Sequence, residues 1–239
     1  MKKEIIEEVK ETVIETEEQR LPMLGEKAPY FETITTNGNL CFPNDYAGKW
    51  VVFFSHPADF TPVCTTEFMT FQSRYAEFKK LNTELLGLSI DSIFSHIAWI
   101  NSIKKYQYKD IKDQEIMFPV IPDIKQDVAK LYNMVHPNIS TTNAIRAVFI
   151  IDPNGIIRTI LYYPASTGRN FDEIIRILIA LQTSDKEQCA TPADWKPGED
   201  VVVPPATSVS EARKRLANQD GFTSCQDWFL CFKKSKSKQ

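Results

Sequence analysis

The sequence lacks long hydrophobic runs and clustered positive charge. None of its apolar stretches approaches the roughly 20 residues needed to cross a bilayer, and its acidic N-terminus has no apolar core of a secretory signal. We therefore expect a cytoplasmic protein that does not act at a membrane. The formal net charge of -3 provides no basic face for nucleic acid, so no nucleic-acid partner is expected either.

Motifs that hold phosphate or metal are also missing. The chain has no glycine-rich phosphate loop and no histidine-rich cluster, so neither an organic cofactor nor a metal is expected. Its five cysteines are an odd number at irregular spacing, which argues against a complete disulfide framework. In a reducing compartment, cysteines are kept for reactivity, metal binding or packing. The five are Cys41, Cys64, Cys189, Cys225 and Cys231.

The order of the elements that are present predicts an α/β fold. The apolar and aromatic run from Trp50 to His56 is typical of a strand covered on both faces. Aromatic residues at spacings of three and four then predict a helix over 65–81. The alternation of strands and helices predicts a mixed sheet with helices on its faces. Further elements are expected as a hairpin turning at Asn37-Gly38, a strand over 84–91, a helix over 92–106, a strand over 118–123, a short helix through 131, two strands around 153–155 and a helix over 171–182.

Three parts follow one another along the chain. Residues 1–22 carry apolar residues every four positions among glutamates, which predicts an amphipathic helical extension over 2–20. Residues 23–183 form the main domain. Residues 184–239 form an arm that prolines interrupt before a helix near 210–218.

The arm is expected to pack on another subunit and to serve dimerisation. Its large apolar side chains, Trp195, Trp228 and Phe229, have too few neighbours in the arm to build a core there. The final KKSKSKQ is expected as a disordered tail.

Cys64 carries the strongest chemical signal in the chain. It follows a strand and a proline-containing loop and is predicted to lie in the first turn of a helix, where unpaired N–H groups favour thiolate over thiol. Since an ordinary thiol is about 3% ionised at pH 7, ionisation alone raises its rate by at most about 30-fold. Donors aimed at the charge that grows on a leaving atom must add the rest. Thr61, one turn earlier, and an arginine are candidates.

At this point the residues resemble a known family. Pro57, Thr61 and Cys64 match the P-x-x-x-T-x-x-C signature of peroxiredoxins, and SHPADFTPVCTTE is similar to the subfamily of peroxiredoxin 6 and its archaeal relatives. RAVFIIDPNGIIR and YYPASTGRNFDEI resemble later segments of that subfamily, so the resemblance runs from about Leu24 to Pro205. It implies a thioredoxin-like fold with an extended C-terminal arm. It also implies a thiol-specific peroxidase that reduces hydrogen peroxide and organic hydroperoxides through a cysteine sulfenic acid.

The resemblance also implies roles for individual residues around Cys64. Pro57 would shield the thiolate, the Thr61 hydroxyl would contact thiolate and peroxide, and Arg146 would stabilise thiolate and transition state. His56 and Arg169 match subfamily positions beside that site and are expected to help bind substrate.

The C-terminal cysteines gain meaning only from the resemblance. Five residues separate Cys225 from Cys231, too many for a C-x-x-C motif. Archaeal relatives carry a similarly spaced pair, which implies that Cys225 resolves the oxidised Cys64 of a neighbouring subunit, while Cys231 exchanges disulfide with Cys225 or simply packs. The implied partners are a peroxide, thioredoxin or a similar dithiol, and a second copy in a homodimer or a larger ring such as a decamer. Glutathione, in a one-cysteine cycle, is the alternative reductant if Cys225 cannot reach.

Other functions fit the sequence less well. A disulfide reductase needs a C-x-x-C motif, whereas Cys64 is followed by Thr65, Thr66 and Glu67. A holdase-type chaperone would not need Cys64 at all. The phospholipase activity of peroxiredoxin 6 needs a serine before the central strand, where this chain has NDYAGKW, so it is not expected. Residues without a site motif are expected to be structural or inert: His96, His136, Cys41 and Cys189.

Overall fold

The computed structural model describes residues 21–217 and 221–236. The helix predicted over 2–20 lies outside the described residues. Within the described ranges, no helix is both long enough and apolar enough to cross a bilayer.

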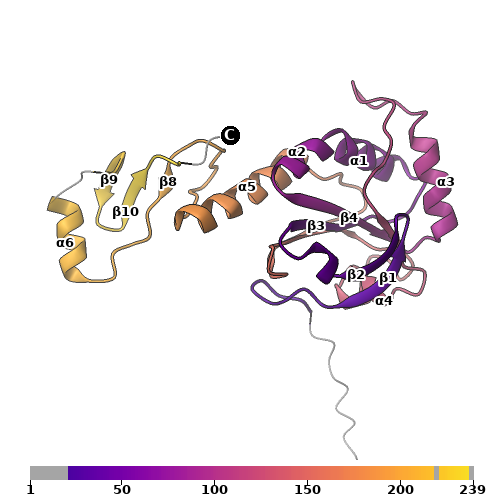
Figure 1. Cartoon of the computed structure of the whole chain (residues 1–239), viewed down its shortest axis with the longest axis horizontal. Helices are drawn as coiled ribbons and strands as arrows, with labels where there is room; N and C mark the ends of the chain where they lie inside the picture. Colours follow the sequence, from indigo (N-terminus) through magenta and orange to yellow (C-terminus); the bar gives the residue numbers. More distant parts are fainter. Residues whose placement is uncertain (1–20, 218–220, 237–239) are drawn as a thin grey trace, which may run out of the picture.

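A mixed sheet of five strands, in the order β5-β4-β3-β6-β7, forms the centre of the molecule (Figure 1). The central strand β3 (Trp50–Ser55) runs parallel to β4 (Thr83–Ser89) and antiparallel to β6 (Arg146–Ile151). β5 (Val120–Pro122) pairs with β4, and β7 (Ile157–Tyr163) forms the other edge on β6. Every residue of β3 and β6 is buried, which confirms that the run from Trp50 is a doubly covered strand.

Four helices cover one face of this sheet. α1 (Pro62–Ser73), α2 (Tyr75–Lys80), α3 (Ile93–Ile103) and α5 (Phe171–Glu187) contribute to one apolar cluster that includes alternate residues of β3. The predicted helix over 65–81 is in fact two helices, because the chain turns at Arg74. The sequence pattern did not reveal this break, since apolar spacings of three and four continue through the turn.

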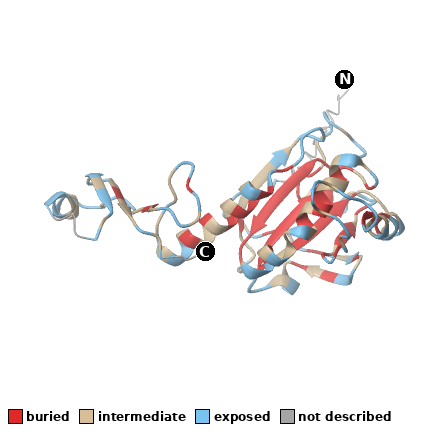
Figure 2. Cartoon of the chain, turned by 90° about the horizontal axis from the view of Figure 1, so that it is seen from above, coloured by how far each residue is buried: buried red, intermediate tan, exposed pale blue. Residues whose placement is uncertain are grey.

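The opposite face is covered by a hairpin and a short helix. β1 (Phe31–Thr35) pairs antiparallel with β2 (Gly38–Phe42), which confirms the predicted hairpin. A single 3-10 turn, η1 (Asn44–Tyr46), follows it, and α4 (Asp127–Leu131) completes this layer. Burial is concentrated in the sheet between the two layers, as Figure 2 shows.

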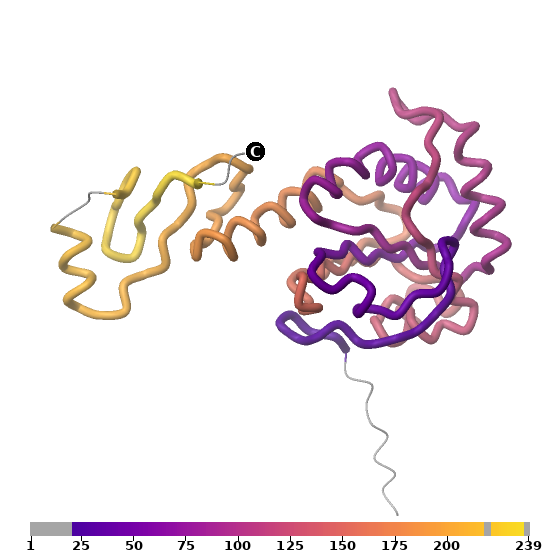
Figure 3. The backbone as a smooth tube through the Cα atoms, in the orientation of Figure 1, coloured from indigo at the N-terminus to yellow at the C-terminus, as the bar shows by residue number. Residues whose placement is uncertain are grey.

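The C-terminal arm has more structure than the sequence predicted. It contains β8 (Val201–Val202), α6 (Val209–Ala217), β9 (Ser224–Asp227) and β10 (Leu230–Lys233). The three strands form a separate sheet in the order β8-β10-β9. This small sheet and α6 lie beyond the end of α5, away from the main body (Figure 3).

Trp195 corrects one expectation about the arm. It is 1% exposed and packs with Ala180 of α5 and Val201 of β8, while its indole N–H donates to the carbonyl oxygen of Glu199. Trp195 therefore has a core in its own chain and needs no partner surface. Trp228 and Phe229 remain partly exposed, at 38% and 49%.

Candidate active site

Cys64 lies on the third residue of α1, with its side chain fully buried. Pro62 opens the helix, where its fixed φ suits the first turn and its missing N–H costs nothing. Thr61 is the N-cap, and its hydroxyl donates to the carbonyl oxygen of Ala58 at 2.9 Å. Pro57 is buried in the preceding loop. The cysteine thus lies where the first N–H groups of the helix have no partners within the helix.

Arg146 brings a positive charge to this thiol. It is the first residue of β6, next to the central strand, and its Nη1 lies 3.3 Å from Sγ of Cys64. The same nitrogen donates to Oε2 of Glu67 at 2.8 Å, while Nε and Nη2 donate to the carbonyl oxygen of Ala165. The structure therefore places two of the predicted site residues, Cys64 and Arg146, in direct contact. Hydrogen bonds to Glu67 and Ala165 hold the guanidinium in place.

Glu67 is a site residue that the sequence reasoning missed. Its carboxylate accepts hydrogen bonds from Arg146 and from Nε and Nη2 of Arg169, at 3.0 and 2.6 Å. Burial would raise the pKa of Glu67, but Arg169 and Arg146 outweigh it and hold that pKa below its ordinary value. One signal was available: Glu67 follows Cys64 by one helical turn on the apolar face of α1, where an acid needs a charged partner.

Arg169 contacts Glu67 rather than the Cys64 thiol. Besides Glu67, its Nη1 donates to the carbonyl oxygens of Ser55 and Ala147, at 3.0 and 3.1 Å. Its guanidinium also lies over the rings of Phe54 and Phe71. Through these contacts, Arg169 links the carboxylate of Glu67 to the ends of β3 and β6.

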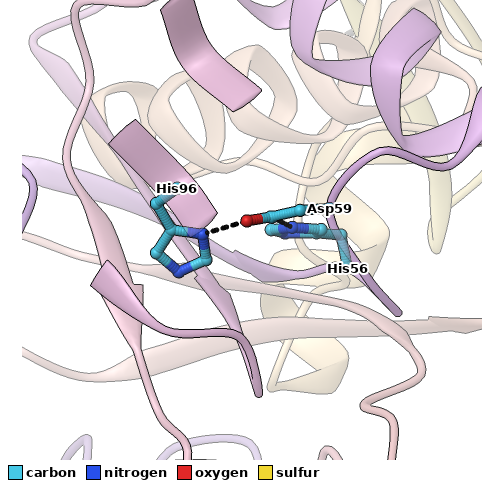
Figure 4. A group of neighbouring side chains, drawn as sticks. All are labelled: His56, Asp59 and His96. Atoms are coloured by element: carbon cyan, nitrogen blue, oxygen red, sulfur yellow. Dashed lines mark hydrogen bonds and ion pairs between the residues drawn. The ribbon is translucent and has the colours of Figure 1, made fainter. Parts of the chain in front are cut away.

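His56 takes part in a buried chain of hydrogen bonds (Figure 4). Its Nε2 lies 2.9 Å from Oδ1 of Asp59, and Oδ2 of Asp59 lies 2.8 Å from Nδ1 of His96. Burial favours protonated Asp59, yet the hydrogen bonds from both histidines hold its pKa below the ordinary value. Burial lowers the pKa of His56, against the opposing effect of Asp59. His96, expected to be structural, thus shares an acid with a predicted site residue.

A hollow of about 250 Å³ lies beside the first turn of α1. Thr61 and Thr65 contribute to its wall, and Phe60 lies at its edge. Phe60 has a φ of 55° although it is a bulky residue, and it is 58% exposed. Strained backbone of this kind clusters at functional sites.

The C-terminal cysteines lie far from this site in the same chain. Cys225 and Cys231 face each other across β9 and β10 and are joined by a disulfide. Cys225 lies in a strand, because pairing with β10 orders the segment. Cys41, Cys64 and Cys189 are free thiols.

Comparison with known proteins gives consistent matches over nearly the whole chain. Residues 24–160 match the AhpC/TSA family, and residues 180–219 match the C-terminal domain of 1-Cys peroxiredoxin. A peroxiredoxin of Methanosarcina mazei is 59% identical over 219 residues, covering 91% of this chain and all of that protein (100%).

Solved structures agree with these matches. A yeast mitochondrial 1-Cys peroxiredoxin superposes with a TM-score of 0.77 at 39% identity, covering 90% of this chain and 100% of the other. A cysteine-to-serine mutant of peroxiredoxin 6 from Arenicola marina gives 0.77 at 33% identity, covering 90% of this chain and 99% of its own. Both confirm the predicted thioredoxin-like fold with a C-terminal extension.

A buried cysteine at a helix start, contacted by a fixed arginine on a thioredoxin-like sheet, is the arrangement expected of a reactive thiol. The relatives make the class specific. The chain belongs to the peroxiredoxin family and is a thiol peroxidase.

Proposed function

We propose that Cys64 is the residue that attacks the peroxide. Its thiolate takes one oxygen of ROOH to give the sulfenic acid Cys64–SOH, and the other oxygen leaves as RO⁻, which takes up a proton to become an alcohol or water. The observation that carries this assignment is the 3.3 Å contact between Sγ of buried Cys64 and Nη1 of Arg146. A fixed cation at that place stabilises both the thiolate and the charge that develops as the O–O bond breaks.

The remaining site residues support this step in different ways. Pro57 shields the sulfur, and the Thr61 hydroxyl, at the N-cap of the same helix, orients the peroxide. Glu67 holds the guanidinium of Arg146 in place, and Arg169 acts through Glu67 rather than on substrate. His56, which follows the end of β3 and precedes Pro57, helps to bind the substrate.

We also propose a two-cysteine cycle. Cys225 of a partner subunit condenses with the sulfenic acid of Cys64, which forms a disulfide and releases water. The Cys231 thiolate then attacks Cys225, which frees Cys64 as a thiol and leaves Cys225 joined to Cys231. That last disulfide is the one present in the structure. Because the arm lies beyond α5 and away from α1, the cysteine is supplied by a partner's arm (Figure 1).

The reductant that reopens the Cys225–Cys231 disulfide is proposed to be thioredoxin or a similar dithiol. The yeast neighbour is described as resolving its thiol through glutathione and thioredoxin systems. A one-cysteine cycle with glutathione is the second candidate, since residues 180–219 match the C-terminal domain of 1-Cys peroxiredoxin. That match ends before Cys225 and so does not cover the cysteine pair.

The cycle needs at least a homodimer, and a larger ring such as a decamer is compatible with it. We propose residues 23–183 as the peroxidase domain, 184–239 as the arm that joins subunits, and 1–22 as an extension. A cytoplasmic location suits three free thiols, which a reducing compartment preserves.

Disulfide mapping tests the proposal most directly. Wild-type protein is reduced, treated with one equivalent of hydrogen peroxide, quenched and mapped by mass spectrometry without reductant. We expect a Cys64–Cys225 crosslink between chains, followed by Cys225–Cys231. Cys64→Ser should abolish single-turnover peroxide consumption, whereas Cys41→Ser, the matched control, should keep it. A Cys64→Ser protein that still consumed peroxide would refute the assignment, and one that kept only aggregation suppression would point to a holdase role.

A further inference from the structure

The hydrogen-bond chain of His56, Asp59 and His96 fixes where its protons lie. Nε2 of His56 faces Oδ1 of Asp59, Nδ1 of His96 faces Oδ2 of Asp59, and Nε2 of His96 faces the carbonyl oxygen of Ile121 at 3.1 Å. The three side chains are at most 1% exposed, so bulk solvent does not reach them. The hydrogen bonds from both histidines hold the pKa of Asp59 below its ordinary value against the effect of burial, so Asp59 is a carboxylate at neutral pH. Each of the three contacts then has an acceptor oxygen on one side.

Counting protons gives the charge of the group. A carboxylate and a backbone carbonyl only accept hydrogen bonds, so both nitrogens of His96 must donate. Three hydrogen bonds need three protons, whereas two neutral histidines bring two. The third proton makes His96 an imidazolium that balances the Asp59 carboxylate. The group is then neutral as a whole, which a fully buried site requires.

The same count leaves Nδ1 of His56 without a proton. Among the side chains that the structure describes, this nitrogen is buried and has no hydrogen-bond partner. A proton there would make the group carry a net charge of about +1 in a dry environment, which is costly. Burial lowers the pKa of His56, in agreement with a bare nitrogen.

A metal ion at this place fits the geometry less well. One ligand atom from each residue lies within 4.8 Å of the others, so an ion between them is conceivable. However, the nitrogen-to-oxygen distances of 2.9 and 2.8 Å are those of hydrogen bonds. With a zinc ion about 2.0–2.2 Å from each ligand atom, these nitrogen and oxygen atoms would lie farther apart than a hydrogen bond allows.

The group is packed against the helix that carries Cys64. The ring of His56 lies 4.8 Å from that of Phe68 and 5.1 Å from that of Trp99, both members of the apolar cluster that contains Cys64. The indole of Trp99 in turn donates to the hydroxyl of Thr65, the residue after Cys64. A further charged group, Asp91, faces this set and accepts from the backbone N–H of Asp59 at 3.0 Å.

We propose that His96 is a positioning residue of the peroxidase site: through Asp59 it keeps His56 neutral, with its proton on Nε2 and a lone pair on Nδ1. This deepens the function proposed for Cys64 and rests on it. The lone pair is a proton acceptor within the buried cluster around the reacting cysteine. Without the charge on His96, Asp59 would draw a second proton onto His56 and turn that acceptor into a donor.

Two variants separate this role from simple packing. His96→Gln removes the imidazolium and leaves the Asp59 carboxylate with His56 as its only titratable partner in the group. Adding Asp59→Asn removes the carboxylate charge as well. In the double variant, the new amide oxygen at position 59 can accept from His56, and the amide nitrogen there can donate to the side-chain oxygen at position 96. The amide nitrogen at position 96 can donate to Ile121. The double variant thus restores a neutral, fully hydrogen-bonded chain, although it has lost more of the native residues.

Proton–nitrogen correlation NMR on the isotope-labelled full chain tests the proposal without any variant. At pH 7, wild type should show His96 protonated on both nitrogens and His56 on Nε2 alone. In His96→Gln, His56 should carry both protons, and in the double variant it should return to one. His96 with a single proton in wild type would overturn the proposal. So would a stoichiometric zinc ion in the purified protein, bound by these histidines.

Kinetics give the second readout. At pH 7, His96→Gln should lower the second-order rate constant with hydrogen peroxide by on the order of 10-fold or more, and the rate should recover as the pH rises and His56 loses its extra proton. The double variant should restore most of the rate and flatten the pH profile. A double variant slower than His96→Gln would mean that the residues only pack. Because Cys64→Ser tests the nucleophile separately, failure here would leave the function proposed for Cys64 intact.

Discussion

At the scale of single residues, the site depends on one acid shared by two arginines. Arg146 and Arg169 would repel each other, and Glu67 lies between them with hydrogen bonds to both. The arrangement leaves Arg146 free to touch Cys64 with the same nitrogen that Glu67 holds. Glu67 therefore fixes where the positive charge of Arg146 lies relative to the Cys64 thiol.

The first prediction concerns Arg146. Replacing it by alanine should slow peroxide reduction by on the order of 100-fold or more, the scale of losing one preorganised transition-state donor. Arg146→Lys should recover part of the rate, since it keeps the charge without the planar fork. Arg158→Ala is the control, because Arg158 pairs with Asp185 at the surface. Stopped-flow measurement of the rate of peroxide reduction tests this prediction. An unchanged rate in Arg146→Ala would show that Arg146 does not stabilise the transition state.

The second prediction concerns Glu67. Glu67→Gln leaves two buried guanidinium groups without a counter-charge and should lower the free energy of unfolding by about 3 to 5 kcal/mol. Glu77→Gln, which breaks a half-exposed pair with Arg74, should cost at most about 1 kcal/mol.

The pH dependence of stability provides an independent check. Folding lowers the pKa of Glu67. The ionised carboxylate therefore stabilises the folded state fully at pH values above the unfolded pKa of about 4.3. This stabilisation is lost as the pH falls below that value and through the folded pKa. Denaturation in urea at pH 7 and at pH 3.5 should show a smaller loss on acidification in Glu67→Gln than in wild type. Equal losses in the two proteins would show that Glu67 is not ionised in the folded state.

At the scale of elements, the predicted and observed helices and strands agree where the residues of an element are buried in a regular pattern. β3 was predictable because a strand buried on both faces is apolar throughout, and α1 because its aromatic residues mark one face. Cys64 was predicted as a site residue from its motif and Arg146 from the resemblance, and the structure places the two in contact.

The sequence could not reveal features that arise from contacts between distant segments. The position of Glu67 on the apolar face of α1 signalled a charged partner, but its partners lie 79 and 102 residues away, so the sequence did not identify them. The strands β9 and β10 have only 4 residues each, and their pairing is visible only once the chain is folded. Trp195 looked like an interface residue because the sequence does not show that the chain folds back to pack it against Ala180 of α5.

The third prediction concerns the C-terminal hairpin. In Cys225→Ser the first turnover should persist, but cycling with thioredoxin should collapse, and Cys64 should accumulate as sulfenic or sulfinic acid. Cys231→Ser should be milder and should trap the Cys64–Cys225 crosslink, because the second exchange is removed. Cys189→Ser is the control. Normal cycling in Cys225→Ser would favour the one-cysteine cycle with glutathione.

At the scale of the whole molecule, the arm leaves apolar surface uncovered. Trp228 and Phe229 stack edge to face and are partly exposed at the turn between β9 and β10. They belong to the yellow segment of the arm, which lies beyond α5 and away from the main body (Figure 3). Such a surface favours association with a second copy.

The fourth prediction is that the protein is at least a dimer. Light scattering at micromolar concentration should give a mass of at least twice the 27.4 kDa of one chain. Replacing Trp228 and Phe229 together by serine should shift the protein toward the monomer and slow thioredoxin-dependent cycling. Ile34→Ser, at an exposed position of β1, should do neither. A monomeric wild type would refute both the dimer and the crosslink between subunits.

The length of α5 sets the direction as well as the reach of the arm. Its 17 residues span about 26 Å, with Ile174 and Leu178 anchored on the sheet and Ala180 packed against Trp195. A helix turns by about 100° for each residue, so removing two residues beyond the anchor shortens it by only about 3 Å but swings the arm to the opposite side. In the proposed two-cysteine cycle, the helical phase of α5, far more than its length, therefore sets which neighbouring active site Cys225 reaches. Insertions and deletions in this helix should be tolerated in whole turns.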